Sequence, residues 1–348
     1  MSRKQIIISI VGASLLTIGT VGGIWSGIDA MPQIINNIQV ERNKQSEKEV
    51  IYNTKEKIEK LNIDATVSNI VVKKHDKPNI IVERSGNKEI STTTIESKNN
   101  ELVIKEERKT VTKETKNVDD IVKYFIDEMY SSYSSQITVY LPEKVNADIK
   151  TDYNSIMFED DIVSDTLNYE TSSGYITLNS DMNFENLNVK SDSDISLAVD
   201  EMSGIKNVNL IANSVNIHEN NSIVNESNIP ENIEIKTTSK NYDTCDVTIN
   251  SSVPVAKNLI IDSTSKVELD LPIVDYKFNF DVKASRSIEF DASNDEKYYN
   301  TPVEKYFRDR DDQERNLIKE FNGLINDETS NSKNEYFVKI RSGYTEFN

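Results

Sequence analysis

The stretch that decides the fold is a repeated phrase, seen in VNADIKTDYNSIMF (145–158), TLNYETSSGYITL (166–178) and NLNVKSDSDISL (186–197). In each copy apolar and polar residues alternate, a small residue and a polar turn follow, and a second short alternation ends the unit. The first apolar positions of seven such units stand at 147, 167, 187, 208, 233, 259 and 280, so the steps are 20 to 26 residues. Alternation with a period of two predicts strands. A repeat of this length predicts a solenoid whose stacked units share one core.

Equivalent positions in successive units carry similar residues. The third position is always small, which predicts a tight corner: Thr151, Thr171, Ser191, Ala212, Thr237, Ser263 and Ala284. Among the outward positions, Lys150, Glu170 and Lys190 form one column, and opposite charges on neighbouring strands favour pairing. A second column predicts a ladder of amide hydrogen bonds: Asn168, Asn188 and Asn209. We therefore expect parallel rungs, with an antiparallel array of hairpins as the alternative.

The N-terminal segment predicts a membrane anchor. Residues 6–25, IIISIVGASLLTIGTVGGIW, carry no charge and as a helix would span about 30 Å, the thickness of the hydrocarbon core. Arg3 and Lys4 precede the run and Asp29 follows it, so we expect a signal anchor at 6–27 with residues 1–5 in the cytoplasm. The sequence thus predicts a single-pass cell-membrane protein with its C-terminal domain outside the cytoplasm. The charged segment 28–60 is expected to be a polar stalk.

The remaining residues, 61–348, are expected to form one all-β domain with two helical insertions. Apolar residues recur at helical spacing over 117–130, which predicts a helix that caps the open end of the stack. Thr301, Pro302 and Glu304 match a capping box with proline at the first helical position, so a second helix is expected over 301–322. The strand pattern then returns near the end of the chain and predicts a last β unit at 338–347.

Composition restricts the possible partners. The 348 residues include 40 Lys and Arg against 58 Asp and Glu, for a net charge of −18. A chain this acidic lacks the basic surface that nucleic-acid binding needs. Cys245 is the only cysteine, so the chain cannot form an internal disulfide, and its place in a strand pattern predicts a structural thiol.

No catalytic motif stands out in the sequence. His75 and His218 are isolated and lack metal-ligand spacing, and no cofactor fingerprint is present. Asp192 and Asp194 lie in a turn, near where Asp152 of another unit would stack, which leaves a weak calcium site open. The abundant carboxylates also leave open a polysaccharide-acting enzyme, since such enzymes place acidic groups on adjacent rungs. We expect neither a catalytic residue nor a cofactor.

Three segments carry a resemblance to a known family: ITVYLP (137–142), TLNYETSSGYITL (166–178) and FVKIRSGYTEF (337–347). They resemble the bacterial "putative adhesin" family of β-strand-repeat proteins, which repeats a strand, a Thr-x-Ser-Gly turn and a second strand. Ser173-Gly174 and Ser342-Gly343 keep the Ser-Gly, whereas the other units replace it. The resemblance implies a right-handed β-solenoid, often with a membrane anchor, and in some members an association with envelope-stress signalling.

These observations favour a non-enzymatic protein. We expect a membrane-anchored solenoid whose outer surface meets a protein or a cell-wall polymer in adhesion or envelope sensing. The alternatives are a polysaccharide-acting enzyme on the same fold and a self-associating scaffold. Gly19, Gly23 and Gly27 lie on one face of the expected anchor, which leaves a homo-oligomer possible, although small residues are common in membrane helices.

Overall fold

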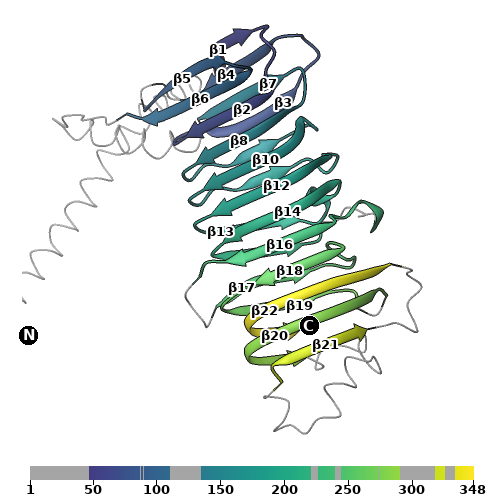
Figure 1. Ribbon diagram of the computed structural model, residues 1–348. Helices are drawn as coiled ribbons and strands as arrows, with labels where there is room; N and C mark the ends of the chain where they lie inside the picture. The colour runs from purple at the N-terminus through teal and green to yellow at the C-terminus, as the bar shows by residue number, and fades with distance from the viewer. Residues whose placement is uncertain are drawn as a thin grey trace, which may run out of the picture.

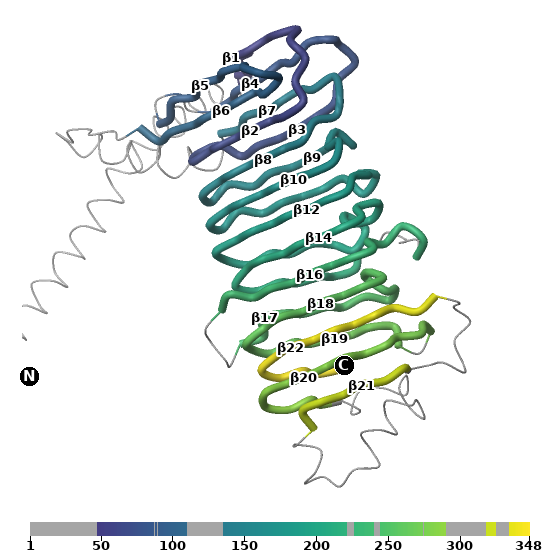
Figure 2. Tube along the Cα trace, viewed as in Figure 1, coloured from purple at the N-terminus to yellow at the C-terminus, as the bar shows by residue number. Residues whose placement is uncertain are grey.

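The computed structural model describes residues 47–86, 88, 90–109, 135–220, 226–239, 244–273, 275–290, 318–325 and 334–348. They form an elongated stack of strands around one core, and the chain winds through successive turns (Figures 1 and 2). Each regular turn, or rung, has one strand on each of two faces. This arrangement bears out the all-β repeat structure expected from the sequence.

The first face, which we call the ladder face, is a parallel array of long strands. Its regular strands are β2 (Lys60–Ala65), β8 (Val145–Thr151), β10 (Val163–Thr171), β12 (Phe184–Ser191), β14 (Ile205–Ala212), β16 (Asn232–Thr237) and β18 (Asn258–Asp262). The second face carries β3 (Asn69–Lys74), β9 (Ile156–Phe158), β11 (Ile176–Leu178), β13 (Asp194–Ala198), β15 (Ser214–His218), β17 (Cys245–Asn250) and β19 (Lys266–Asp270). Equivalent residues of neighbouring rungs pair in register, as Leu167 does with Ala147 and Leu187.

The core lies between the two faces and follows from the alternation. Leu167, Leu187 and Leu210 are fully buried, whereas their strand neighbours point outward. Burying a leucine side chain contributes about 1.5–3 kcal/mol, so the stacked apolar columns supply the main stabilisation. A single rung could not exclude water from its own apolar residues, which is why the units are stable only as a stack.

The small residues lie at the corner between the faces, as expected. Thr151 and Thr171 are buried, and their hydroxyl groups hydrogen-bond each other at 3.1 Å. Thr171 Oγ1 also donates to the carbonyl of Asp152 and accepts from the backbone N–H of Gly174. A Cβ at Gly174 would lie only 2.0 Å from the carbonyl oxygen of Asn154, so only glycine fits there. The corner thus needs small side chains that can satisfy the backbone.

The last rungs depart from the order of the sequence. The final strand, β22 (Glu335–Phe347), inserts between β18 and β19 on one side and β20 (Lys277–Phe290) on the other, parallel to all three. Figure 1 shows β22 in yellow between green strands. Both β20 and β22 run through the corner and contribute to both faces. The unit at 280–290 therefore stacks on Val338 and Ile340 and not on the unit at 259–269.

Antiparallel strands end the stack. At the N-terminal end β5 (Ser91–Lys98) pairs with β6 (Glu101–Arg108), and β4 (Ile80–Ser85) lies between β1 (Glu49–Thr54) and β7 (Gln136–Leu141). At the other end β21 (Glu320–Ile325) runs antiparallel to β20. β1 comes from the segment expected to be a polar stalk. Ends that differ from the repeat reduce the tendency of stacked rungs to extend onto another copy.

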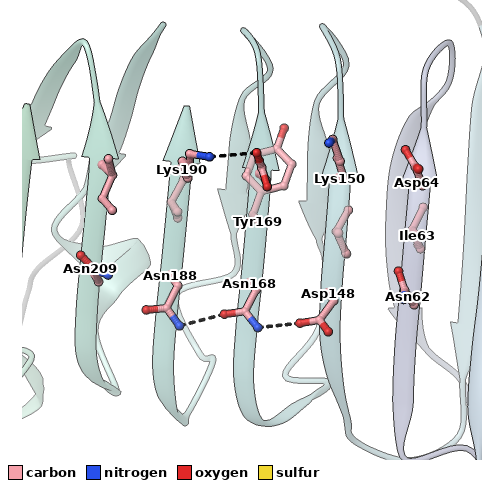
Figure 3. Close-up of a pocket in the computed structure, with 14 residues that line it drawn as sticks. Asn62, Ile63, Asp64, Asp148, Lys150, Asn168, Tyr169, Asn188, Lys190 and Asn209 are labelled. Carbon is pink, nitrogen blue, oxygen red and sulfur yellow. Dashed lines mark hydrogen bonds and ion pairs between the residues drawn. The ribbon is translucent and has the colours of Figure 1, made fainter. Parts of the chain in front are cut away.

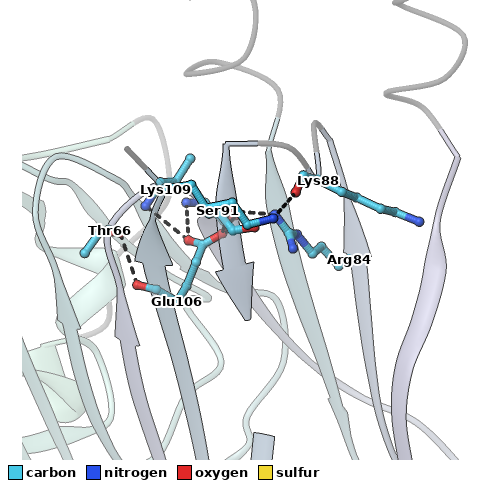
Figure 4. A network of polar contacts seen from close by, with 8 residues as sticks. Thr66, Arg84, Lys88, Ser91, Glu106 and Lys109 are labelled. Carbon is cyan, nitrogen blue, oxygen red and sulfur yellow. Dashed lines mark hydrogen bonds and ion pairs between the residues drawn. The ribbon is translucent and has the colours of Figure 1, made fainter. Parts of the chain in front are cut away.

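A buried ionic cluster closes the core at the N-terminal end (Figure 4). The Glu106 side chain is fully buried, and its Oε2 accepts hydrogen bonds from the backbone N–H groups of Val67 and Ser68 at 3.1 and 2.8 Å. Its Oε1 accepts from the hydroxyls of Ser68 and Ser91, both at 2.7 Å, and lies 3.9 Å from Arg84 Nη2. A buried carboxylate needs this many donors because it has left water.

A second carboxylate bridges a break in the other face. In the described residues β11 pairs only with β9, and β13 only with β15. Glu201 fills the gap, since its carboxylate accepts from the backbone N–H groups of Ala198 at 2.8 Å and Leu178 at 3.4 Å. Burial raises the pKa of Glu201 above its usual range, although both hydrogen bonds oppose the shift.

The expected helical insertions are not supported. Among the described residues there is no α-helix, and the helical turns are two short 3-10 segments, Asp200–Met202 and Glu226–Asn228. The end of the helix expected at 301–322 is instead the start of β21, because Phe321 packs into the core while the backbone pairs with β20. The helix expected at 117–130 and residues 301–317 lie outside the described residues.

The expected membrane anchor is also corrected. In the part of the chain that the structure describes, no helix is both long and apolar enough to cross a membrane. The anchor expected at 6–27 lies outside those residues. The cell-membrane location was predicted from that anchor, so this prediction is withdrawn with it.

Candidate functional site

The outward side chains of the ladder face form columns that run along the stack. Glu170 is aligned with Lys150 on one side and Lys190 on the other, as the sequence predicts. Lys190 Nζ lies 3.0 Å from Glu170 Oε1, and this hydrogen bond lowers the pKa of the glutamate and raises the pKa of the lysine. Both side chains are about half exposed, so the pair contributes more to local order than to stability.

The neighbouring column is a ladder of amides that ends on a carboxylate. Asn188 Nδ2 donates to Asn168 Oδ1 at 2.8 Å, and Asn168 Nδ2 donates to Asp148 Oδ1 at 2.5 Å (Figure 3). Lys60 Nζ lies 2.5 Å from the other oxygen of Asp148. Burial opposes ionisation of Asp148, but the hydrogen bonds from Asn168 and Lys60 outweigh it and lower its pKa. The predicted amide ladder is confirmed between Asn188 and Asn168, and Asn209 is aligned with Asn188 in the next strand.

A longer amide ladder lies two positions earlier along the strands, from β18 to β12, and sequence reasoning missed it. Asn258 donates to Asn232 at 3.0 Å, Asn232 to Asn207 at 2.8 Å, and Asn207 to Asn186 at 3.1 Å. Asn186 in turn donates to the hydroxyl of Thr166 at 3.4 Å. The sequence contains the signal for this ladder, because each of these asparagines directly precedes the first apolar position of its unit, at 187, 208, 233 or 259.

A trough of about 480 Å³ runs along the ladder face between two of these columns. One wall is the amide column and the other is the charged column; the floor is the strand backbone. The lining side chains include Asn62, Asp148, Asn168, Asn188 and Asn209 on one wall, and Asp64, Lys150, Glu170, Lys190 and Ile211 on the other. Figure 3 shows the two walls as two rows of side chains that cross the same strands. The trough crosses five strands, so its axis is the axis of the stack.

The ladder face is neutral in a strongly acidic protein. Its three columns, followed from β5 to β21, hold nine basic and nine acidic side chains: Lys60, Lys98, Lys105, Lys150, Lys190, Lys236, Lys283, Lys339 and Arg341, against Asp64, Glu96, Glu101, Asp148, Glu170, Glu234, Asp262, Asp281 and Glu320. The net charge of −18 is therefore carried by other parts of the chain. A partner that approaches this face meets paired charges and amides rather than a single-sign field.

The ion site left open by the sequence is not assembled in the described residues. Asp152 and Asp192 occupy equivalent corners, but Ser172 of the intervening rung separates them, so they lie two rungs apart. Asp194 begins β13 and accepts a hydrogen bond from Ser214. No group of three or more His, Cys, Asp or Glu side chains in that part of the chain is arranged to hold a metal ion.

The remaining candidates lie apart from the trough. His75 makes a short contact of 2.5 Å with the carbonyl of Asn79 and packs edge-on against Tyr140, whereas His218 ends β15 beside Ser196. Cys245 begins β17 and is half-buried, and burial raises the pKa of its thiol. A thiol that resists ionisation suits the structural role expected from the sequence.

Comparison with known proteins places the chain in a family. It is similar to the crystal structure of a "putative cell adhesion protein" from Clostridium sporogenes ATCC 15579, with 12% identity and a TM-score of 0.22 over 87% of this chain and 96% of that one. It is also similar to a "putative adhesin" from Bacteroides fragilis NCTC 9343, with 10% identity and a TM-score of 0.33 over 88% of this chain and 98% of that one. No curated protein matches the chain. Residues 58–297 match the family described as Toastrack DUF4097. That match spans more than half of the chain and agrees with the resemblance seen in the sequence, so the protein belongs to the Toastrack DUF4097 family, whose function is unknown.

Proposed function

We propose that this protein is a non-enzymatic binding module that uses the ladder face to hold an extended partner, in adhesion or protein interaction. The observation that carries the proposal is the trough on a neutral, column-ordered face in a chain of net charge −18. A surface of net negative charge repels an acidic partner, whereas a face with balanced charges does not.

The architecture supports a binding role in a second way. The trough is built on strands whose inward residues, such as Ile149 and Val189, are buried in the core. Polar groups held on rigid strands lose little conformational freedom when a partner binds.

The experiment that tests the proposal uses beads coated with the purified full chain. Adhesion to a panel of immobilised proteins and polysaccharides is compared with that of a variant carrying Lys150→Glu and Lys190→Glu, which replaces both cations that line the trough and ends the charge balance of the ladder face. The matched control carries Lys55→Glu and Lys77→Glu, since both lysines are exposed and lie away from the trough. Both variants change the net charge equally.

We expect the trough variant to lose adhesion and the control to keep it. Equal adhesion by all three proteins, or equal loss in both variants, would show that the ladder face is not the binding surface. Catalytic turnover of any panel polysaccharide by the purified chain would instead support the enzyme alternative.

A further inference from the structure

The trough has the dimensions of a site for a linear chain. It crosses five strands from β2 to β14, and adjacent strands lie about 4.8 Å apart, so its length is roughly 19 Å. Each step along the axis presents one side chain from each wall. A ligand that follows the trough therefore meets an asparagine on one wall at four of the five rungs, with Asp148 at the fifth, while the other wall alternates in charge from Asp64 to Lys190 and ends on Ile211.

The amide wall can both donate and accept hydrogen bonds. Asn168 uses one N–H to reach Asp148 and its carbonyl to accept from Asn188. A side-chain amide has two N–H donors and two acceptor lone pairs, so Asn168 retains capacity for one further donor and one further acceptor. Hydroxyl groups, which donate and accept at once, match that capacity better than groups with a single role.

The charges of the trough disfavour a charged ligand. In the lining, Asp148 is paired with Lys60 and Glu170 with Lys190, so a ligand ion would have to compete with these pairs. A polyanion is repelled further by the net charge of −18. A polycation would be attracted by the negative charge of the whole chain and would not bind preferentially to the neutral face.

The rung spacing disfavours a peptide along the axis. Side chains on one side of an extended peptide repeat about every 6.7 Å, which does not match steps of about 4.8 Å. A pyranose ring in an extended glycan, by contrast, advances the chain by about one rung. Each sugar then presents its hydroxyls to one side chain of each wall.

We propose that the trough binds a linear, uncharged polysaccharide that lies along the axis of the stack with about one sugar for each step between neighbouring rungs. This inference rests on the proposed binding function and names the chemical class of its partner. About four sugars fill the length of the trough, so affinity rises with chain length up to that size and then levels off.

The test is isothermal titration calorimetry of the full chain with β-1,4-linked oligomers of glucose, mannose, xylose and N-acetylglucosamine, from the disaccharide to the octasaccharide. Polygalacturonate and oligomers of glucosamine serve as the charged comparisons. The trough variant carries Asn168→Leu and Asn188→Leu. The matched control carries Asn207→Leu and Asn232→Leu, which alter the neighbouring amide ladder but do not line the trough.

We expect at least one neutral series to bind with a plateau near four sugars, a loss of tenfold or more in affinity for the trough variant, and wild-type affinity for the control. No binding by any neutral series, tighter binding of the charged polymers, or equal affinity of both variants would each overturn the inference. If bead adhesion depends on the ladder face while all neutral glycans fail, the binding function stands and the polysaccharide assignment falls. If adhesion is independent of that face, the binding function itself falls.

Discussion

The buried cluster around Glu106 allows a quantitative prediction, for the substitution Glu106→Gln. The carboxylate accepts two backbone N–H groups and two serine hydroxyls, and it faces Arg84. In the best arrangement of the glutamine, its oxygen keeps the two backbone bonds and its NH2 group donates to the serines. The substitution then removes the charge but few of the contacts.

The expected cost follows from that arrangement. Hydrogen bonds to a charged group contribute about 1.5–3 kcal/mol against about 1 kcal/mol for neutral ones, so weakening the two backbone bonds costs about 1–4 kcal/mol. Arg84, whose side chain is 8% exposed, also loses its buried counter-ion, and removing one member of a buried pair costs about 3–5 kcal/mol in total. We therefore expect Glu106→Gln to lower the free energy of unfolding by about 3 kcal/mol.

The assay is urea denaturation of the full chain, combined with hydrogen exchange. Because Glu106 lies at one end of a repeat stack, we expect the loss of protection to concentrate in β2, β5 and β6. The double variant Arg84→Met and Glu106→Gln should be less destabilised than the sum of the two single variants, because each single variant already removes the contact between the two charges and the double variant loses it only once.

A cost below about 1 kcal/mol for Glu106→Gln would refute the reasoning, since it would mean that the ionised carboxylate adds nothing to its neutral contacts. Strict additivity of the two single variants would refute the coupling to Arg84.

Four further predictions test the register, the corner, the last strand and the response to pH. Val189→Asp places a charge in the core, where the valine is 2% exposed, and should cost several kcal/mol, whereas Lys190→Asp should be nearly neutral in urea denaturation; equal tolerance would contradict the register. Gly174→Ala should destabilise by more than the usual surface change, because the new Cβ would meet backbone at 2.0 Å; an unchanged urea midpoint would contradict this. A chain that ends at residue 334 should lose protection from hydrogen exchange in β18, β19 and β20, and a synthetic peptide of residues 335–348 should restore it. Unchanged protection after the truncation would contradict the insertion of β22. The hydrogen bond from Arg341 at 2.6 Å lowers the pKa of Asp281, so the ionised Asp281 stabilises the fold above its unfolded pKa of about 3.9, and this stabilisation is lost as pH falls through the lower folded pKa. Asp281→Asn should therefore make the urea midpoint depend less on pH between pH 4 and pH 2. An unchanged pH dependence would contradict the linkage.

Much of the ladder face was predictable from the sequence. The alternation specifies which residues face inward, and the fixed small residue marks the corner, so the repeat alone is enough to place Lys150, Glu170 and Lys190 in one column. The burial of Glu106 was also accessible, since it continues the inward positions of Leu102 and Ile104. A charged residue in an inward position is a signal for a buried cluster.

Other features could not be read in this way. The segment 301–322 matches the local signals of a helix start, yet Glu320–Ile325 forms a strand because the edge of β20 offers hydrogen bonds and the core accepts Phe321. Local capping signals report only on the first turn of a helix, and tertiary pairing overrides them where a sheet edge is available.

The sequence by itself determined the repeat, the inward and outward residues and the polar columns, because all of these depend on the period of two within a strand and on the length of the repeat. Only the tertiary structure decided the order of the last rungs and the existence of the trough. The units at 277–290 and 335–347 carry the same pattern, so either could stack on β18 and β19, and the choice of β22 depends on how three strands pack together. A pattern of alternation specifies the face of each residue, whereas the neighbour of each strand is selected by packing and pairing across the whole core.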